Sequence, residues 1–399
     1  MKQKKKPAGL SVLGGEGSVK RKKRRRGSAL MLITGAVVLA AAVALGALAA
    51  AGITPPEVFY GVKTTIRGMV SGDGFPYETG AGEVRSFAAL GRNVLLVDES
   101  GMRAVSAYGD SLFTGHHGFA DAVCETNGTQ ALVFDRGGKG YVVLDSYRLL
   151  RSDRESNAIL AGAIGRKGNV AFTEKSDSAM CELRVLDRRG AEVYNYLFSS
   201  ERAAAVALSD NGKRAAVALI AAKNAEIYTK LVVLDFSSEK PLFTPIIYKG
   251  TAMMRLKFLA DGRLMAVGDT MLSVVNCADA SKVDTPYTNG ELTAAAFSPG
   301  GITAVAMTRF GNTADSLVKV FSDEGQFLFE KKIDREVKAV ACGKRNICVL
   351  TEGGLLVFSD TGEQLFSAHP ANAGMRIAAA GGACFVLSPG EVQKYTGES

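Results

Sequence analysis

The segment that follows residue 74 repeats one short pattern about every forty residues. Each unit has a strand of small apolar residues, a turn rich in Gly or Asn, and a second apolar run. A third strand and a turn follow in several units, and the form Asp-x-x-Gly, as at Asp187 to Gly190, is a hairpin signal. The equivalent starts of these units are Val84, Ala120, Ile159, Ala203, Met253, Thr293, Val337 and Arg376. Their spacings are 36, 39, 44, 50, 40, 44 and 39 residues. Four short strands per unit at this period are typical of a β-propeller, so the sequence predicts an all-β domain.

The last unit is one strand short. It begins at Arg376 and stops at Tyr395 after three strands, while Gly74 to Gly80 could form a strand that precedes the first unit. We therefore expect Gly74 to Gly80 to supply the outer strand of the last blade, which would remove the open edges of the stack. The sequence predicts an eight-bladed β-propeller. Seven blades are the alternative, if the weakest unit, Met253 to Cys277, merges with a neighbour.

An uncharged stretch, Gly27 to Pro56, follows the basic run Lys20 to Arg26. About 20 apolar residues suffice to cross a bilayer as a helix, and Lys/Arg-rich flanks stay on the cytoplasmic side. We expect a disordered cytoplasmic basic tail at 1–28, one transmembrane helix at 29–53, a linker at 54–73 and an extracytoplasmic propeller at 74–396. Ala49 and Ala51 would also suit a signal-peptidase site, so a cleaved leader is the alternative.

The positive charge of the chain belongs to the tail. The chain has 48 Lys and Arg against 40 Asp and Glu, and residues 1–26 hold 11 of the basic residues and one of the acids. The remainder has 37 basic and 39 acidic residues, a formal charge of −2. A basic domain would favour nucleic acid, and this one is nearly neutral. We expect no nucleic-acid partner, and we expect the tail to contact anionic lipid headgroups.

The residue types that carry chemistry are few and scattered. The three histidines are the adjacent pair His116 and His117, and His369 before a proline. Three such residues without metal-ligand spacing or a nucleophile motif favour solvated loop positions. We predict no catalytic residue, no metal site and no cofactor.

Six cysteines occur in the predicted propeller, mostly in apolar strands: Cys124, Cys181, Cys277, Cys342, Cys348 and Cys384. Cysteine in such a strand behaves as a small hydrophobic residue, so buried free thiols are expected. The exception is the pair Cys342 and Cys348, which flank one turn and could face each other across a hairpin. A bridge between them is the alternative.

Acidic residues recur at the turns of the repeat, at positions that the pattern treats as equivalent: Asp98, Asp187, Asp235, Asp323 and Asp360. Recurrence at equivalent hairpins favours a structural role, because an Asp side chain can accept hydrogen bonds from the backbone of its own turn.

The repeats resemble those of the WD40-like and quinoprotein-like propellers over residues 74–396. With the basic tail, the single span, the Gly74-Phe75-Pro76 entry and hairpins such as Phe358 to Phe366, the chain resembles a bacterial family of single-span membrane proteins with an extracytoplasmic propeller of unknown function. The chain has no Trp, so the Trp-Asp dipeptide and the Trp of quinoprotein repeats are missing. We therefore assign to this chain no cofactor-binding or partner-binding residue known from either group.

A membrane-anchored, non-catalytic module that binds a protein or an envelope polymer is the function that this organisation favours. Tyr77, Tyr108, Arg136 and Tyr228 are candidate contact residues in or near loops, since aromatic and Arg side chains often anchor interfaces. The alternative is an extracytoplasmic enzyme or ligand sensor with its site in the central channel. A convergent cluster of Arg, His, Tyr or Asp at the channel would favour that alternative.

Overall fold

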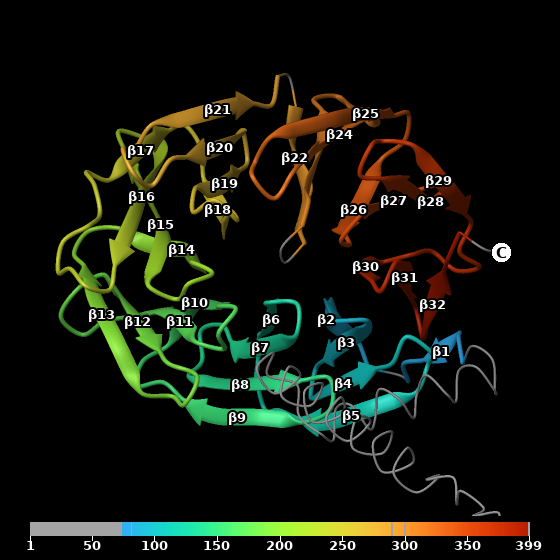
Figure 1. Ribbon diagram of the computed structural model, residues 1–399, viewed down its shortest axis with the longest axis horizontal. Coiled ribbons are helices and arrows are strands. Elements are labelled where there is room, and N and C mark those ends of the chain that lie inside the picture. The colour runs from blue at the N-terminus through green and yellow to red at the C-terminus, as the bar shows by residue number, and fades with distance from the viewer. Residues whose placement is uncertain (1–73, 81, 289, 299–300, 398–399) are drawn as a thin grey trace, which may run out of the picture. The chain divides into compact units, whose positions relative to one another are not determined.

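The computed structural model describes residues 74–80, 82–288, 290–298 and 301–397. The predicted tail, span and linker lie outside these ranges. Within them the chain forms only β-strands, β1 to β32, arranged as eight four-stranded sheets around a common centre (Figure 1). No helix in this part of the chain has the length and hydropathy to cross a membrane. The prediction of an eight-bladed, all-β propeller is confirmed.

Blades 1 to 4 follow one another along the chain, each with its strands in sequence order from the centre outward. Blade 1 comprises β2 (Val84–Leu90), β3 (Asn93–Asp98), β4 (Gly101–Val105) and β5 (Ser111–His116). Blade 2 comprises β6 (Ala122–Thr126), β7 (Gln130–Asp135), β8 (Gly140–Asp145) and β9 (Leu149–Arg154). Blade 3 comprises β10 (Ile159–Ile164), β11 (Val170–Glu174), β12 (Cys181–Leu186) and β13 (Glu192–Phe198). Blade 4 comprises β14 (Arg202–Leu208), β15 (Arg214–Lys223), β16 (Glu226–Asp235) and β17 (Ile246–Lys249).

Blades 5 to 7 repeat this order. Blade 5 comprises β18 (Met253–Phe258), β19 (Leu264–Gly268), β20 (Met271–Val275) and β21 (Lys282–Pro286). Blade 6 comprises β22 (Gly290–Phe297), β23 (Thr303–Arg309), β24 (Asn312–Phe321) and β25 (Phe327–Ile333). Blade 7 comprises β26 (Val337–Cys342), β27 (Asn346–Thr351), β28 (Gly354–Ser359) and β29 (Gln364–Ala368). The weakest predicted unit thus forms a complete sheet as blade 5, and the seven-blade alternative is wrong.

Blade 8 joins the two ends of the propeller. It comprises β30 (Arg376–Ala380), β31 (Ala383–Ser388), β32 (Glu391–Tyr395) and, as its outer strand, β1 (Tyr77–Glu78). β1 runs antiparallel to β32, with Tyr77 opposite Val392. The Phe75 ring lies 5.4 Å from that of Phe385, and Thr79 N donates to Gly390 O at 2.8 Å. The predicted closure by Gly74 to Gly80 is confirmed.

The two faces of the ring carry different turns. Strands alternate in direction within a blade, so the turns after the first and third strands lie on one face. Gly74 lies there, because its N donates to Tyr108 O in the third turn of blade 1 at 2.9 Å. We call this the entry face. The opposite face carries the turns after the second strands and the connections between blades, and we call it the connection face.

A Ser, Asp or Asn begins the turn between the third and fourth strands in seven blades. Each accepts hydrogen bonds from backbone N–H groups of its own turn, and the residues are Ser106, Asp145, Asp187, Asp235, Asn276, Ser322 and Ser359. This side chain replaces a backbone acceptor and fixes the turn. The structural role predicted for Asp187 and Asp235 is therefore confirmed.

The predicted equivalence of the other three acids is wrong. Asp98 also accepts from its own turn, at Ser100 N and Gly101 N, but this turn follows a second strand and lies on the connection face. Asp323 and Asp360 each come one position after the serine that fixes the turn. They form ion pairs instead, with Lys257 of blade 5 at 3.0 Å and with Arg345 at 3.1 Å.

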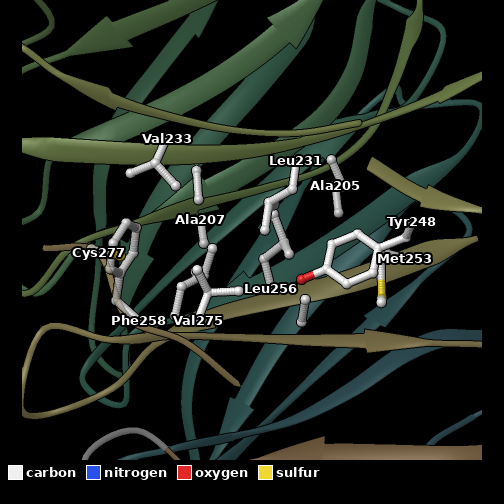
Figure 2. Close-up of a cluster of buried hydrophobic side chains, with 14 residues drawn as sticks. Ala205, Ala207, Leu231, Val233, Tyr248, Met253, Leu256, Phe258, Val275 and Cys277 are labelled. Atoms are coloured by element: carbon white, nitrogen blue, oxygen red, sulfur yellow. The ribbon is translucent and has the colours of Figure 1, made fainter. Parts of the chain in front are cut away.

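The core lies between blades rather than at one centre. Between blades 4 and 5, small residues of β14 such as Ala205 and Ala207 pack with Leu256 and Phe258 of β18 (Figure 2). Val233 of β16 and Val275 of β20 belong to the same cluster. Both faces of each sheet are buried in this way, which explains the runs of consecutive apolar residues in the second strands. Small residues dominate the inner strands because eight strands converge there.

We predict that the contact of the chain entry with blade 1 stabilises the ring. A Cβ at Gly109, whose φ is +82°, would lie 2.5 Å from Gly74 O, whereas a Cβ at Gly390, with φ +83°, would meet nothing within 4 Å. Gly390→Ala should lower the unfolding free energy by about 1 kcal/mol through its φ alone. Gly109→Ala should lower it by roughly 3 kcal/mol, because backbone atoms must also move apart. Denaturant unfolding of both variants measures the difference, and equal losses would contradict the prediction.

Candidate interaction site

A groove of about 490 Å³ lies between blades 6 and 7. It opens at the connection face, at Gly353 and Gly354, and runs along β28 and β29 as far as Phe358 and Gln364. Its floor is apolar and comes from both blades: Ile333 at the end of β25, and Leu356 and Phe358 of β28. Its rim carries Lys331, Lys332, Arg335 and His369. An apolar floor with a few charged groups around it is the usual composition of a binding site.

The glycine pair Gly353 and Gly354 shapes one wall of the groove. A Cβ at Gly353 would collide with the guanidinium group of Arg335, so the side chain of Arg335 lies directly against this residue. Gly354 has φ +133°, and a Cβ there would lie 2.6 Å from Ala368 O. His369 Nδ1 lies 2.9 Å from Gly353 O, which holds the imidazole at the rim.

The charges at the rim are unevenly distributed. Lys332 Nζ lies 3.6 Å from the Asp334 carboxylate and 3.8 Å from that of Asp315, in pairs that solvent screens. A second hollow of about 360 Å³ adjoins the groove and shares Asp334, Arg335 and Gly353 with it, but it also contains Glu336 and Glu352. The groove is therefore basic at one end and acidic at the other.

The eight inner strands surround the central channel (Figure 1). None of them contains His, Tyr or Asp within its described bounds. Glu125 of β6 and Arg255 of β18 are their most notable charged residues. Burial raises the pKa of Glu125, and the positive charge of Arg255 opposes this shift. Arg255 Nη1 donates to Ala295 O at 2.5 Å, and its guanidinium lies 5.4 Å from the centre of the Phe297 ring.

The three histidines lie in separate environments. His116 ends the outer strand of blade 1 and is exposed, whereas His117 stacks on Phe119 at 5.0 Å with Nε2 3.1 Å from Asp98 O. Burial lowers the pKa of His117. His369 lies in another blade, at the rim of the groove. Among the residues with described positions, no three His, Cys, Asp or Glu side chains are grouped as metal ligands.

All six cysteines are free thiols, and all but Cys124 are buried. The expectation that Cys342 and Cys348 could face each other across their hairpin is wrong. Cys342 pairs with Ile347, and Cys348 pairs with Ala341, so the two thiols point to opposite faces of the sheet. Cys342 packs toward blade 6 and Cys348 toward blade 8. Burial raises the pKa of Cys342 to about 12.

The four candidate contact residues do not gather on one surface. Tyr77 is half-buried in the core between blades 8 and 1, and Tyr108 lies on the entry face with the Lys394 ammonium 5.5 Å from its ring. Arg136 lies on the connection face and pairs with Asp121 at 2.8 Å, while Tyr228 belongs to β16 of blade 4. Sequence reasoning also missed the groove, for which the run Lys331 to Arg335 was the available signal.

A family model matches residues 76–394, and its description is a family of unknown function (DUF5711). The chain belongs to this family. The resemblance expected from the sequence, to a propeller family of unknown function, is confirmed to that extent. No curated protein matches the chain in sequence.

Three solved structures are similar to this DUF5711 chain. The C-terminal WD40 domain of Sif2 is 11% identical with a TM-score of 0.57, over 79% of this chain and 95% of that one. A eukaryotic initiation factor is 10% identical with a TM-score of 0.51, and the match covers 78% of this chain and 83% of that one. BamB from Moraxella catarrhalis is 14% identical with a TM-score of 0.49, and the match covers 78% of this chain and 96% of that one. At these identities the first two show a shared propeller fold and nothing about activity.

A buried carboxyl cluster joins blades 2 and 3 on the connection face. Glu174, at the end of β11, is fully buried, and neither of its carboxyl oxygens has a hydrogen-bond partner among the described groups. Glu155, from the connection between the blades, is 6% exposed and pairs with Arg184 Nη1 at 2.5 Å. Burial, and then the negative charge of Glu155, raise the pKa of Glu174 to about 8. At neutral pH Glu174 is therefore mostly protonated.

We predict that Glu174 makes this DUF5711 chain less stable as pH rises. Between about 4.5 and 8 the unfolded chain loses a proton that the folded chain keeps, so the unfolding free energy falls across this range. Glu174→Gln removes the titration and should raise that free energy at pH 8 by roughly 1–3 kcal/mol, with little effect at pH 5. The control is Glu192→Gln, at the exposed partner of Arg184, which should change it by less than about 1 kcal/mol. A pH-independent effect of Glu174→Gln in denaturant titrations would contradict the prediction.

Proposed function

We propose that the propeller is a non-catalytic protein-interaction module that uses its connection face. The observation that carries this proposal is the groove between blades 6 and 7, which combines an apolar floor with a charged rim. It lies on the face opposite to Gly74, where the chain enters the ring. A module tethered through residue 74 would therefore present the groove away from its attachment. The WD40 domain of Sif2 shows that the same fold occurs as a discrete domain.

We further propose that residues 29–53 anchor this module in a membrane, with residues 1–28 in the cytoplasm and the propeller outside. The uncharged stretch and its one-sided basic flank support this arrangement. The partner is then a protein or polymer of the envelope, and the basic tail adds contacts with anionic lipid headgroups. The nearly neutral charge after residue 26 speaks against a nucleic-acid partner.

A second candidate function is a ligand sensor or enzyme with its site in the central channel. Glu125 and Arg255 favour this candidate, since a carboxyl group and a guanidinium on inner strands, close enough to influence each other, could bind a polar ligand. We rank it second because the inner strands bring no His, Tyr or Asp to the same place.

The anchoring proposal predicts the response of whole cells to protease. With any cell wall removed, protease added to intact cells should degrade the propeller and leave the basic tail protected. A tag at each end of the full chain, followed by immunoblotting, measures this. Survival of the propeller until the membrane is permeabilised would contradict the proposed orientation.

The interaction proposal predicts site-specific crosslinking in living cells. Ser367 lines the groove, and Lys213 is exposed on the entry face of blade 4. A photo-crosslinking amino acid at position 367 of the full chain should yield one discrete adduct with another protein. The same amino acid at position 213 should yield none. Adducts of equal strength at both positions, or none at 367, would contradict the use of this groove.

A further inference from the structure

The groove between blades 6 and 7 has features that specify its ligand. We propose that it binds an extended acidic segment of a partner protein, with apolar side chains interspersed among the acidic ones. This inference rests on the proposed function, because it names the chemistry of the partner that the module would take. The charge of the rim, the apolar floor and the acidic hollow beside the groove support this inference.

The rim attracts carboxylates. Lys331 of β25 and Arg335 of the next connection provide two cations at the groove, since Lys331 lies on the same face of the sheet as Ile333. Lys332 lies on the other face, and its ammonium is already 3.8 Å from the Asp315 carboxylate. Asp334 is the single acid among the residues that line the groove. Asp334 is 87% exposed and already lies 3.6 Å from Lys332. An approaching carboxylate therefore meets an excess of positive charge, over a range of about 8 Å at physiological salt.

The floor selects apolar side chains between the acidic ones. Ile333 and Phe358 have exposures of 6% and 5%, and Leu356 packs against the same cluster, so the floor is formed by core residues that cannot swing aside. A volume of about 490 Å³ accommodates a few side chains rather than a folded domain. An extended segment with alternating acidic and apolar residues would place one set on the rim and the other on the floor.

The acidic hollow limits the ligand at one end. Glu336 and Glu352 lie beyond Arg335, in the adjoining space of about 360 Å³. Their carboxylates repel an acidic ligand, so the bound segment should extend from Arg335 toward Lys331. Arg335 marks the boundary, and its guanidinium is held in place against Gly353.

The test uses the full chain in a non-ionic detergent and a fluorescein-labelled peptide of six alternating Glu and Leu residues. Fluorescence anisotropy should show binding that weakens as salt is raised, while the matched Lys–Leu peptide should not bind. The double variant Lys331→Glu, Arg335→Glu should weaken binding at least about tenfold, because each attraction becomes a repulsion. Lys213→Glu with Lys249→Glu, on exposed sites of blade 4, makes the same change in net charge and should leave affinity within about twofold.

A variant that keeps every charge gives a second readout. Gly353→Ala displaces the Arg335 guanidinium without altering the net charge. It should lower the affinity for the Glu–Leu peptide about threefold or more, while the melting temperature stays within a few degrees of that of the parent protein. This variant keeps the proposal testable if the charge reversal unfolds blade 6.

Three results would overturn the inference. The first is equal binding of the two peptides. The second is an equal loss of affinity for the Glu–Leu peptide in the groove variant and in the blade 4 variant. The third is binding of anionic phospholipid vesicles or polyphosphate in place of the peptide. If the peptide fails while the crosslink at position 367 persists, the acidic ligand is wrong and the interaction module stands. Loss of both refutes the proposed function itself.

Discussion

The pairing of β1 with β32 is the interaction on which the rest of the propeller depends. Each blade buries both faces of its sheet against neighbours, so a linear stack would expose two apolar faces. The chain avoids this by placing Tyr77 and Glu78 beside Val392 and Glu391. The Phe75–Phe385 contact then adds an apolar anchor next to these few backbone hydrogen bonds. Every other blade, and the groove between blades 6 and 7, depends on this closure for its position.

The core that results is distributed between blades and built largely from small residues. Alanines of the inner strands let eight sheets approach the centre, and larger side chains such as Leu231 of β16 and Tyr248 of the outer strand β17 fill the wider space farther out (Figure 2). Such packing requires no Trp, which explains how the chain keeps the architecture of Trp-rich repeats without that residue. It also leaves the rims of the blades free to vary, and the groove and the Glu174 cluster both occur there.

The sequence predicted the repeat well because the period of turns and apolar runs is local. The eight inner strands start within three residues of the expected positions, as with Ala122 against Ala120 and Gly290 against Thr293. Features that join two blades could not be read in this way. Lys331 to Arg335 are adjacent in sequence, but the floor that turns them into a groove comes from Leu356 and Phe358. Likewise, Glu174 resembles an ordinary strand end until Glu155 of the neighbouring connection is placed beside it.

The direction of β1 has a mechanical consequence. This strand runs from the entry face to the connection face, antiparallel to β32. A pull on Gly74 against a partner held at the connection face would act along the strand axis. The hydrogen bonds between Tyr77–Glu78 and β32 would then share the load in shear instead of opening one after another. If the chain is tethered and a partner binds as proposed, the same short strand that completes the ring would bear the tension between them.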